Sequence, residues 1–246
     1  MTRVALVTGA TSGIGVVVAQ KLIDDGFQVA VSGRSRERGE RVAAELGEQA
    51  EFFPADLTGE GSARALADEV ARAYGRLDVL VNNAAIDHTN DLLEVTEQEI
   101  RETFETNTFA AMNLLIGAAR HMRSWGGAII NVTSRLASIG VPTMGIYSAS
   151  KGAMLAFTTA AAVDLAKYNI RVNAVAPGMT RTPLYQEWLE SLPDPAAEAA
   201  KVASAIPMGR IAEPEDVAAV VRFLASPEAA YLTGASIPVE GGYLAT

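Results

Sequence analysis

Short apolar runs alternate with helical stretches along the whole of this 246-residue chain. Strands that alternate with helices predict a parallel sheet with helices on both faces. Right-handed crossovers then leave a doubly wound strand order, in which ligands bind at the carboxyl ends of the strands. We therefore expect an α/β fold, a doubly wound parallel sheet flanked by helices, in a single domain spanning residues 1–246. The apolar runs are residues 4–7, 28–32, 51–53, 78–81, 128–132, 170–175 and 236–239.

A glycine-rich turn follows the first apolar run at once. Gly9, Gly13 and Gly15 stand between residues 4–7 and a helical stretch that begins at Val16. Glycines at such a junction let the backbone turn tightly and approach a pyrophosphate, which then lies on the helix N-terminus. The spacing is G-x-x-x-G-x-G and not the commoner G-x-G-x-x-G, and a purely structural turn is the alternative. The turn favours a Rossmann-like, NAD(P)-binding domain.

A second motif is the stretch Tyr147-Ser-Ala-Ser-Lys151. On a helix, a spacing of four places the two side chains on one face. A phenol with a pKa near ~10 is a poor acid or base at neutral pH, and an ammonium one turn away favours the phenolate. The pair therefore suits proton transfer to or from an alcohol or carbonyl oxygen. The spacing alone is weak evidence, but Ser134 follows the apolar run 128–132 and adds a third polar group.

Composition and charge argue against several classes of function. The chain has no cysteine, which excludes disulfides and fits a reducing compartment, so we expect a cytoplasmic protein. Its two histidines, His88 and His121, lie far apart and argue against a metal site or a Ser-His-Asp triad; we read both as exposed or supporting polar residues. A net charge of −9 argues against a nucleic-acid partner or an anionic membrane surface. We see no signal or transit peptide, and no apolar stretch reaches the ~20 residues of a membrane span.

Together these features resemble the classical short-chain dehydrogenase/reductase family. The resemblance covers essentially the whole chain and rests on several separated motifs. It implies an enzyme that interconverts a carbonyl and a secondary alcohol by hydride transfer, as a ketoreductase does. The matching motifs are Thr8-Gly9-(x3)-Gly13-Ile14-Gly15, Asp56-Leu57, Asn82-Asn83-Ala84-Ala85, Asn107, Ser134, Tyr147-(x3)-Lys151, Pro177-Gly178 and Gly241-Gly242.

The resemblance also implies a role for each matched residue. Tyr147 is expected to be the general acid or base, Ser134 to polarise the reacting oxygen, and Lys151 to lower the Tyr147 pKa and hold the nicotinamide ribose. Asn107 is expected to anchor a water in a proton relay through Lys151. Taken one at a time, such residues also occur as satisfied polar groups at turns and strand ends. The residues expected to bind the cofactor are Gly9, Thr11, Ser12, Gly13, Ile14, Gly15, Arg34, Asp56, Leu57, Asn83, Ala84, Tyr147, Lys151, Pro177, Gly178 and Thr180.

The chain departs from the family pattern at two positions. Ala85 replaces the usual glycine of Asn-Asn-Ala-Gly and narrows the space near the cofactor ribose. Arg135 directly follows Ser134, where small or polar residues are commoner; its charge either faces the substrate or pairs with a neighbouring acidic residue. The residues expected to contact substrate are Ser134, Arg135, Met144, Tyr147 and Met179.

The end of the second apolar run indicates which cofactor is used. An NAD-preferring relative would carry an acidic residue near Gly33, to bond both ribose hydroxyls. This chain has none there, and Arg34 is followed by three more arginines up to Arg41. A guanidinium fork matches a phosphate monoester, so we expect NADP(H) rather than NAD. A solvated helix face is the alternative explanation for the arginines, and it fits Arg38 and Arg41 well.

Two further expectations concern the periphery of the molecule. Residues 182–207 break the regular alternation, and we read them as a lid over the strand ends, with a surface helical excursion as the alternative. The alanine-rich stretch Met154–Val163 is apolar on nearly all sides, and the chain ends in an apolar segment, Tyr243-Leu244-Ala245. These features, together with the family resemblance, favour a homotetramer.

Two other functions stay open at this stage. The first is reduction of a 3-oxoacyl group on an acyl carrier protein, which the acidic net charge of −9 disfavours because carrier proteins are themselves acidic. The second is a non-catalytic dinucleotide-binding protein, which could lose Tyr147 or Lys151 without penalty. Here all four residues of the catalytic type are present.

Overall fold

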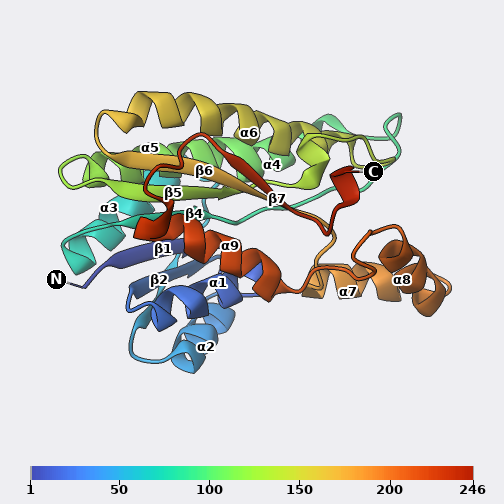
Figure 1. The fold of residues 1–246 in the computed structure, drawn as a ribbon, viewed down its shortest axis with the longest axis horizontal. Helices are drawn as coiled ribbons and strands as arrows, with labels where there is room; N and C mark the ends of the chain where they lie inside the picture. The colour runs from blue at the N-terminus through green and yellow to red at the C-terminus, as the bar shows by residue number, and fades with distance from the viewer. Residues whose placement is uncertain (1, 246) are drawn as a thin grey trace.

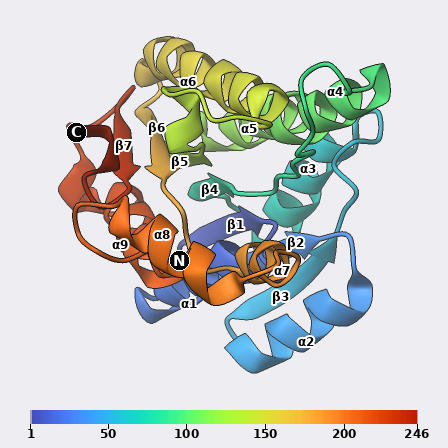
Figure 2. The same ribbon diagram turned by 90° about the vertical axis from the view of Figure 1, so that its right-hand side faces the viewer.

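The structure of the protein, a computed structural model, describes residues 2–245. A seven-stranded, wholly parallel sheet runs through its middle in the order β3-β2-β1-β4-β5-β6-β7 (Figures 1 and 2). Each predicted apolar run lies within one strand or closely matches it, so the predicted doubly wound sheet is confirmed. The strands are β1 (Val4–Thr8), β2 (Gln28–Gly33), β3 (Ala50–Pro54), β4 (Val79–Asn82), β5 (Gly127–Val132), β6 (Ile170–Pro177) and β7 (Ser236–Val239).

The helices connect the strands and cover both faces of the sheet. In Figure 2, α3, α4, α5 and α6 lie on one side of the sheet, while α1, α2 and α9 lie on the other. The helices are α1 (Gly13–Asp24), α2 (Arg36–Leu46), α3 (Ser62–Tyr74), α4 (Glu97–Phe104), α5 (Ala111–Met122), α6 (Gly145–Ala166), α7 (Pro183–Glu190), α8 (Pro195–Ser204) and α9 (Pro214–Ala225). A π-helical turn, Glu105–Ala110, joins α4 to α5.

Two hydrophobic cores, one on each face, explain why the strand sequences are unbroken apolar runs. Alternate residues of β1 enter opposite cores: Val7 joins the first, and Leu6 joins the second. Both side chains are fully buried, as expected for a parallel strand covered on both faces. In the first core α1 packs against α9, and in the second α3 packs against α5.

A chain of buried polar side chains fixes the register between β4, β5 and α6. Asn82 of β4 pairs directly with Asn131 of β5, and its Nδ2 donates to Asn131 Oδ1 at 2.9 Å. Asn131 Nδ2 in turn donates to Thr158 Oγ1 on α6 at 2.8 Å. All three residues are buried, and each finds a partner inside the second core. A register slip would leave these groups unpaired in an apolar interior.

The irregular segment 182–207 contains two capped helices. Thr182 accepts a hydrogen bond from the backbone of Tyr185 at the start of α7, and Asp194 caps α8 in the same way. Both helices have proline in the first position, where its missing N–H costs nothing. They lie beyond the carboxyl ends of the strands, at the right of Figure 1. Their apolar side chains form a third cluster, separate from the two cores, with buried members Tyr185, Leu189, Ile206 and Ile211.

Candidate active site

The strand order reverses at β1, which has β2 on one side and β4 on the other. Hydrogen bonds join the turns that follow β1 and β4. Asn83 Nδ2 donates to the carbonyl oxygens of Thr8, at 2.9 Å, and Gly9, at 3.1 Å. Thr8 Oγ1 accepts from the backbone N–H groups of Asn83 and Ala84. The Asn83 carboxamide therefore holds the glycine turn in place. A switch point of this kind is where doubly wound sheets bind ligands.

The glycine turn has the shape of a phosphate-binding cradle. Gly9 and Gly13 have φ of +61° and +55°, a region that favours glycine. A Cβ on Gly9 would lie 2.8 Å from Ala84 Cα, and one on Gly15 would lie 2.8 Å from Ala10 Cα, so neither position has room for a side chain. Ser12, the N-cap of α1, makes no side-chain bond to the helix, and the first turn contains no acidic residue. The first backbone N–H groups of α1 thus suit a pyrophosphate.

A residue that the sequence reading did not single out also borders this cradle. A Cβ on Gly13 would lie 3.3 Å from Thr182 Cγ2, so the start of α7 touches the glycine turn. Thr180, which was expected to approach the nicotinamide, is buried and donates to the Gly178 carbonyl at 3.1 Å. Gly178 N donates to Val239 O at 2.8 Å, which ties the end of β6 to β7. The sequence offered one signal for a role of Thr182 at the cofactor, which is its position two residues after Thr180.

The end of β2 carries the features that were expected to select the cofactor. A Cβ on Gly33 would lie 2.7 Å from Thr11 Cγ2, so Thr11 fills the space where an acidic side chain would begin. Arg34 is exposed, and its charge lowers the pKa of Asp56, after the larger effect of hydrogen bonds from Thr58. Arg34 and Asp56 are therefore neighbours, at the place where the adenosine end of the cofactor is expected.

The other arginines of this region fit the alternative explanation, that they belong to the solvated face of α2. Arg36 pairs with Glu40 at 3.1 Å, and Arg41 lies 4.0 Å from Glu45, both on the exposed surface of α2. The Arg38 backbone N–H donates to the N-cap Ser35. Arg34, by contrast, stands before α2 and makes no ion pair among residues 2–245.

Ser134, Tyr147 and Lys151 meet where β5 ends and α6 begins. Ser134 follows β5 and is buried, and its hydroxyl bonds the Tyr147 phenol. Tyr147 and Lys151 lie one turn apart on α6, and Lys151 Nζ is 5.6 Å from the centre of the Tyr147 ring. Lys151 is 4% exposed, and its Nζ donates to Val132 O at 3.0 Å. The structure therefore brings the three predicted groups together.

Asn107 supports this group from the π-helical turn. Its carboxamide bonds both the N–H and the C=O of Ile86, each at 2.8 Å, and donates to Ser150 Oγ at 3.1 Å. Ser150 Oγ donates in turn to the Tyr147 carbonyl at 2.7 Å. The side chain of Asn107 thus joins the segment after β4 to α6. Its expected part in a water relay stays a prediction.

The pKa of Tyr147 shifts in the direction opposite to the sequence expectation. Burial raises it, the nearby Asp87 carboxylate raises it further, and the hydrogen bond from Ser134 opposes both. Burial also lowers the pKa of Lys151 from 10.5 to about 8, against the attraction of Asp87. The expected lowering by Lys151 does not dominate, because a partly buried phenol resists ionisation and Nζ is directed at Val132 O.

The residues expected to contact substrate lie around this group. The Arg135 guanidinium stacks on the Tyr243 ring at 3.9 Å and forms no ion pair with a carboxylate of residues 2–245, so of its two expected roles only the one toward the substrate stays a prediction. Met144 is the N-cap of α6, and its sulfur accepts from Thr89 Oγ1 at 3.5 Å. Met179 packs against the third cluster, and so does Tyr243, the ring on which Arg135 stacks.

The two histidines lie outside this group. His88 Nε2 lies 3.2 Å from Glu102, and His121 Nε2 lies 2.6 Å from Asp68, both as partly exposed pairs. Within residues 2–245, no cluster of three or more His, Asp or Glu side chains has the geometry of a metal site. In the same range, none of the helices combines the length and hydropathy required to cross a bilayer.

The chain resembles known oxidoreductases over nearly its whole length. A family model described as enoyl-(acyl carrier protein) reductase matches residues 9–244. The chain is 39% identical to L-fucose dehydrogenase of Oryctolagus cuniculus over 241 residues, 98% of this chain and 84% of that protein. It is 36% identical to the NADP-dependent (R)-specific alcohol dehydrogenase of Lentilactobacillus kefiri, with 99% and 97% of the two chains covered.

Two further likenesses bear on the chemistry. The chain is 38% identical to 3-oxoacyl-(acyl-carrier-protein) reductase of Staphylococcus aureus over 247 residues, covering 98% of each protein. Its structure superposes on a variant of actinorhodin polyketide ketoreductase, solved with NADPH, with a TM-score of 0.94 and 32% identity; the match covers 98% of this chain and 97% of the other.

Proposed function

This chain belongs to the classical short-chain dehydrogenase/reductase family, and from that premise we propose that it is an NADP(H)-dependent enzyme that interconverts a ketone and a secondary alcohol. That it is an oxidoreductase acting on alcohol or carbonyl groups follows from the family. The observation that carries the proposal is the contact of Ser134, Tyr147 and Lys151 at the carboxyl end of β5, beside a glycine cradle that suits a dinucleotide.

We assign the proton chemistry to residues of this chain. In the direction of reduction, the Tyr147 hydroxyl donates a proton to the carbonyl oxygen as that oxygen becomes an alcohol. Ser134 donates a hydrogen bond to the same oxygen and holds it near the phenol. Lys151 returns a proton to Tyr147. NADP(H), when bound, supplies the hydride or accepts it in the reverse direction.

The cofactor preference rests on Gly33 and Arg34. Thr11 occupies the place of an acidic side chain at position 33, and Arg34 is exposed beside Asp56 without a salt bridge of its own within residues 2–245. A guanidinium in that place suits a 2′-phosphate. Use of NADP by one relative, and NADPH in a structural neighbour, supports this choice.

The substrate is proposed only as a class. We expect the substrate to meet an apolar side, from Met144 and Met179, and a charged side, from Arg135 and from Asp87, whose carboxylate acts on Tyr147. This mixture suits a modest-sized molecule with both apolar and polar groups. We also propose that the α7/α8 segment acts as a lid over it, since its apolar cluster is separate from the two cores.

Reduction of a 3-oxoacyl group on a carrier protein is the second candidate. The 38% identity to the Staphylococcus aureus reductase favours it, and the net charge of −9 opposes docking of an acidic carrier. The deciding experiment is a screen of both cofactors against simple ketones, L-fucose and a 3-oxoacyl thioester. Turnover of the thioester alone would favour the second candidate, and cofactor binding without any turnover would favour a non-catalytic protein.

We further propose a homotetramer in the cytoplasm. The outer face of α6 is open in the single chain, and Val163 on it is 75% exposed. The C-terminal segment is a weaker argument than it was from sequence, because Tyr243 is partly covered by Arg135 and by the third cluster. The absence of cysteine supports a reducing compartment.

A further inference from the structure

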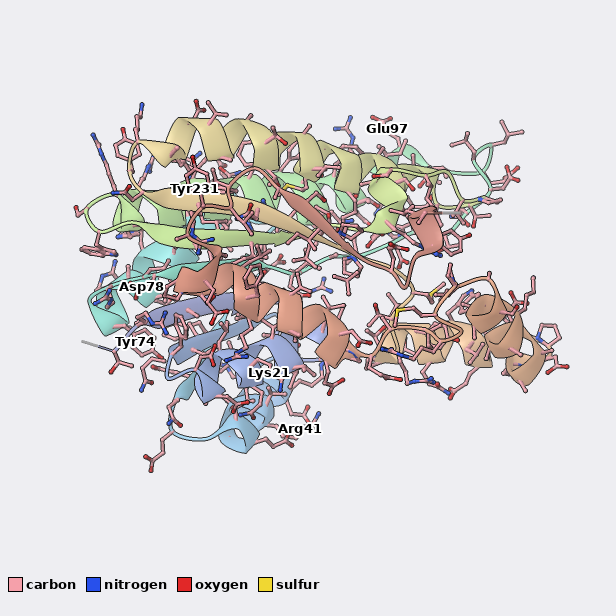
Figure 3. The ribbon with its side chains drawn as sticks, in the orientation of Figure 1. Lys21, Arg41, Tyr74, Asp78, Glu97 and Tyr231 are labelled. Atoms are coloured by element: carbon pink, nitrogen blue, oxygen red, sulfur yellow. The ribbon has the colours of Figure 1, made fainter. Side chains whose placement is uncertain are left out.

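The amino ends of the strands border a cavity of about 230 Å³. It lies at the edge of the sheet opposite the site described above: its wall includes Gly127 at the start of β5, whereas Ser134 follows the end of that strand. Figure 3 shows this end of the molecule at Asp78, on the side away from α7 and α8. The side chains that matter here are Arg3, Phe27, Asp78, Trp125 and Arg171.

Arg171 brings an uncompensated positive charge to this cavity. Its Nη2 donates to the carbonyl oxygens of Leu224, at 2.8 Å, and Ser226, at 3.2 Å. Its Nη1 is buried and has no hydrogen-bond partner among the described residues. Burial lowers the pKa of Arg171, and no carboxylate opposes that shift. A guanidinium keeps its charge in proteins, so one that is partly buried without a counter-ion is costly.

The acidic groups of this edge are engaged elsewhere. Asp78 Oδ2 accepts from Val4 N and from Arg76 Nε, both at 2.8 Å, and Oδ1 accepts from the same arginine. The Asp25 carboxylate accepts from Arg222 Nε at 2.7 Å. Neither carboxylate forms an ion pair with Arg171. The charge on Arg171 is therefore balanced by no side chain of this chain within residues 2–245.

Arg3 adds a second cation with free donors. Its guanidinium lies 4.1 Å from the centre of the Phe27 ring, and the one side-chain hydrogen bond that it forms within residues 2–245, to Asp25 O, is 3.5 Å long. Stacking holds a guanidinium by its face and leaves the N–H edge for an acceptor. Arg3 and Arg171 thus line one cavity in a protein whose net charge is −9.

We propose that this cavity binds a small oxyanion, a phosphate or carboxylate group, between Arg3 and Arg171. Oxyanions accept charge-assisted hydrogen bonds from guanidinium groups in a matching fork. The volume of about 230 Å³ leaves room for such a group with a few further atoms. The ligand is not the substrate of hydride transfer, because the full length of β5 separates the cavity from Ser134.

Trp125 lines the cavity and provides a local signal. The chain has two tryptophans, so the variant Trp188→Phe leaves Trp125 as the single emitter. Inorganic phosphate is titrated into this variant at constant ionic strength, with acetate as a second probe and chloride as the control. We expect saturable quenching or enhancement of Trp125 fluorescence, with a rise in Tm at the same concentrations. The anion that saturates first identifies the head group.

Substitutions then connect the signal to the two arginines. Arg171→Gln and Arg3→Gln should each weaken anion binding by about ten- to a hundredfold, the loss expected for one charge-assisted contact. Arg34→Ala, at the proposed 2′-phosphate position, should leave the Trp125 titration unchanged. If Arg171→Gln does not fold, Arg3→Gln carries the test, because Arg3 holds no buried backbone group. Absence of saturation with either anion, or unchanged affinity in the arginine variants, would overturn the proposal.

Discussion

At the scale of single residues, Tyr147 is the side chain on which the proposed chemistry depends. Tyr147→Phe keeps the ring but removes the hydroxyl that Ser134 bonds. We expect turnover to fall by at least a thousandfold while cofactor affinity stays within a few-fold, since only proton transfer is lost. Steady-state kinetics and a cofactor titration measure the two effects. Activity within tenfold of the wild type would remove Tyr147 from its role.

Lys151 makes the two reaction directions respond oppositely to pH. Its pKa is lowered from 10.5 to about 8, so it is protonated below that pH and neutral above it. Reduction draws a proton from Tyr147 that Lys151 replaces, and its rate should fall as the pH passes about 8. Oxidation needs the reverse transfer and should rise over the same range.

The matched variant for this prediction is Lys151→Arg. Arginine keeps its proton throughout the range, so the transition near pH 8 should disappear from both profiles. Rates in both directions at saturating cofactor provide the measurement. Parallel profiles for the two directions in the wild type would contradict the relay.

Arg34 and Arg36 form a natural pair for testing cofactor choice. Arg34→Ala should weaken NADP(H) by about ten- to a hundredfold and NAD(H) much less, because a charge-assisted phosphate contact is lost. Arg36→Ala removes a similar charge two residues away, but Arg36 already pairs with Glu40 on the surface of α2. It should change neither affinity by more than about twofold. Equal losses for both cofactors in Arg34→Ala would exclude a 2′-phosphate contact.

At the scale of helices and strands, Asn131 is the residue that joins β4, β5 and α6. Asn131→Ala removes the partner of Asn82 and of Thr158 inside the second core. The free energy of unfolding should fall by about 2–4 kcal/mol, since buried polar groups lose their bonds and a void forms. Glu48→Ala, exposed after α2, is the control and should change it by less than about 0.5 kcal/mol. Denaturant titrations at equal protein concentration compare the two variants.

The elements that sequence could predict are those with local signals. The apolar run 51–53 lies inside β3, and the spacing of Tyr147 and Lys151 places both on one face of α6. The glycine turn could be predicted from the sequence because its positive φ angles favour glycine. The π-helical turn at 105–110 was not predicted. The side chain of Asn107 ties this turn to Ile86 and Ser150 by hydrogen bonds, and both residues are far from it in sequence.

The pKa of Tyr147 was missed for a related reason. The spacing on α6 shows that Lys151 is near, but burial of the phenol and the approach of Asp87 depend on the folded environment. The stacking of Arg135 on Tyr243, across more than a hundred positions of sequence, could not be read from either residue. Sequence thus indicated which groups meet, and the structure showed how each one is held.

At the scale of the whole molecule, the outer face of α6 is the test of assembly. Light scattering coupled to size exclusion should give about four times the 25.8 kDa of one chain. Val163→Arg puts a charge on the exposed apolar face and should reduce that mass, because a buried unpaired charge opposes association. Glu48→Arg, exposed after α2, is the control and should leave the mass unchanged. A wild-type mass near 25.8 kDa would refute the tetramer.

The two cores also differ in when a growing chain can complete them. The second core draws its buried residues from Val4 to Val172, whereas the first needs Val217, Val221 and Leu224 of α9 to cover α1. During synthesis, α1 emerges long before its partner helix α9, so Val18 and Leu22 stay uncovered until α9 has left the ribosome. A nascent chain stopped before residue 214 should have one face of its sheet formed and the other exposed. The cell's chaperones should therefore meet this protein mainly through α1, and a message truncated before the codons for α9 should yield an aggregating product instead of a shorter enzyme.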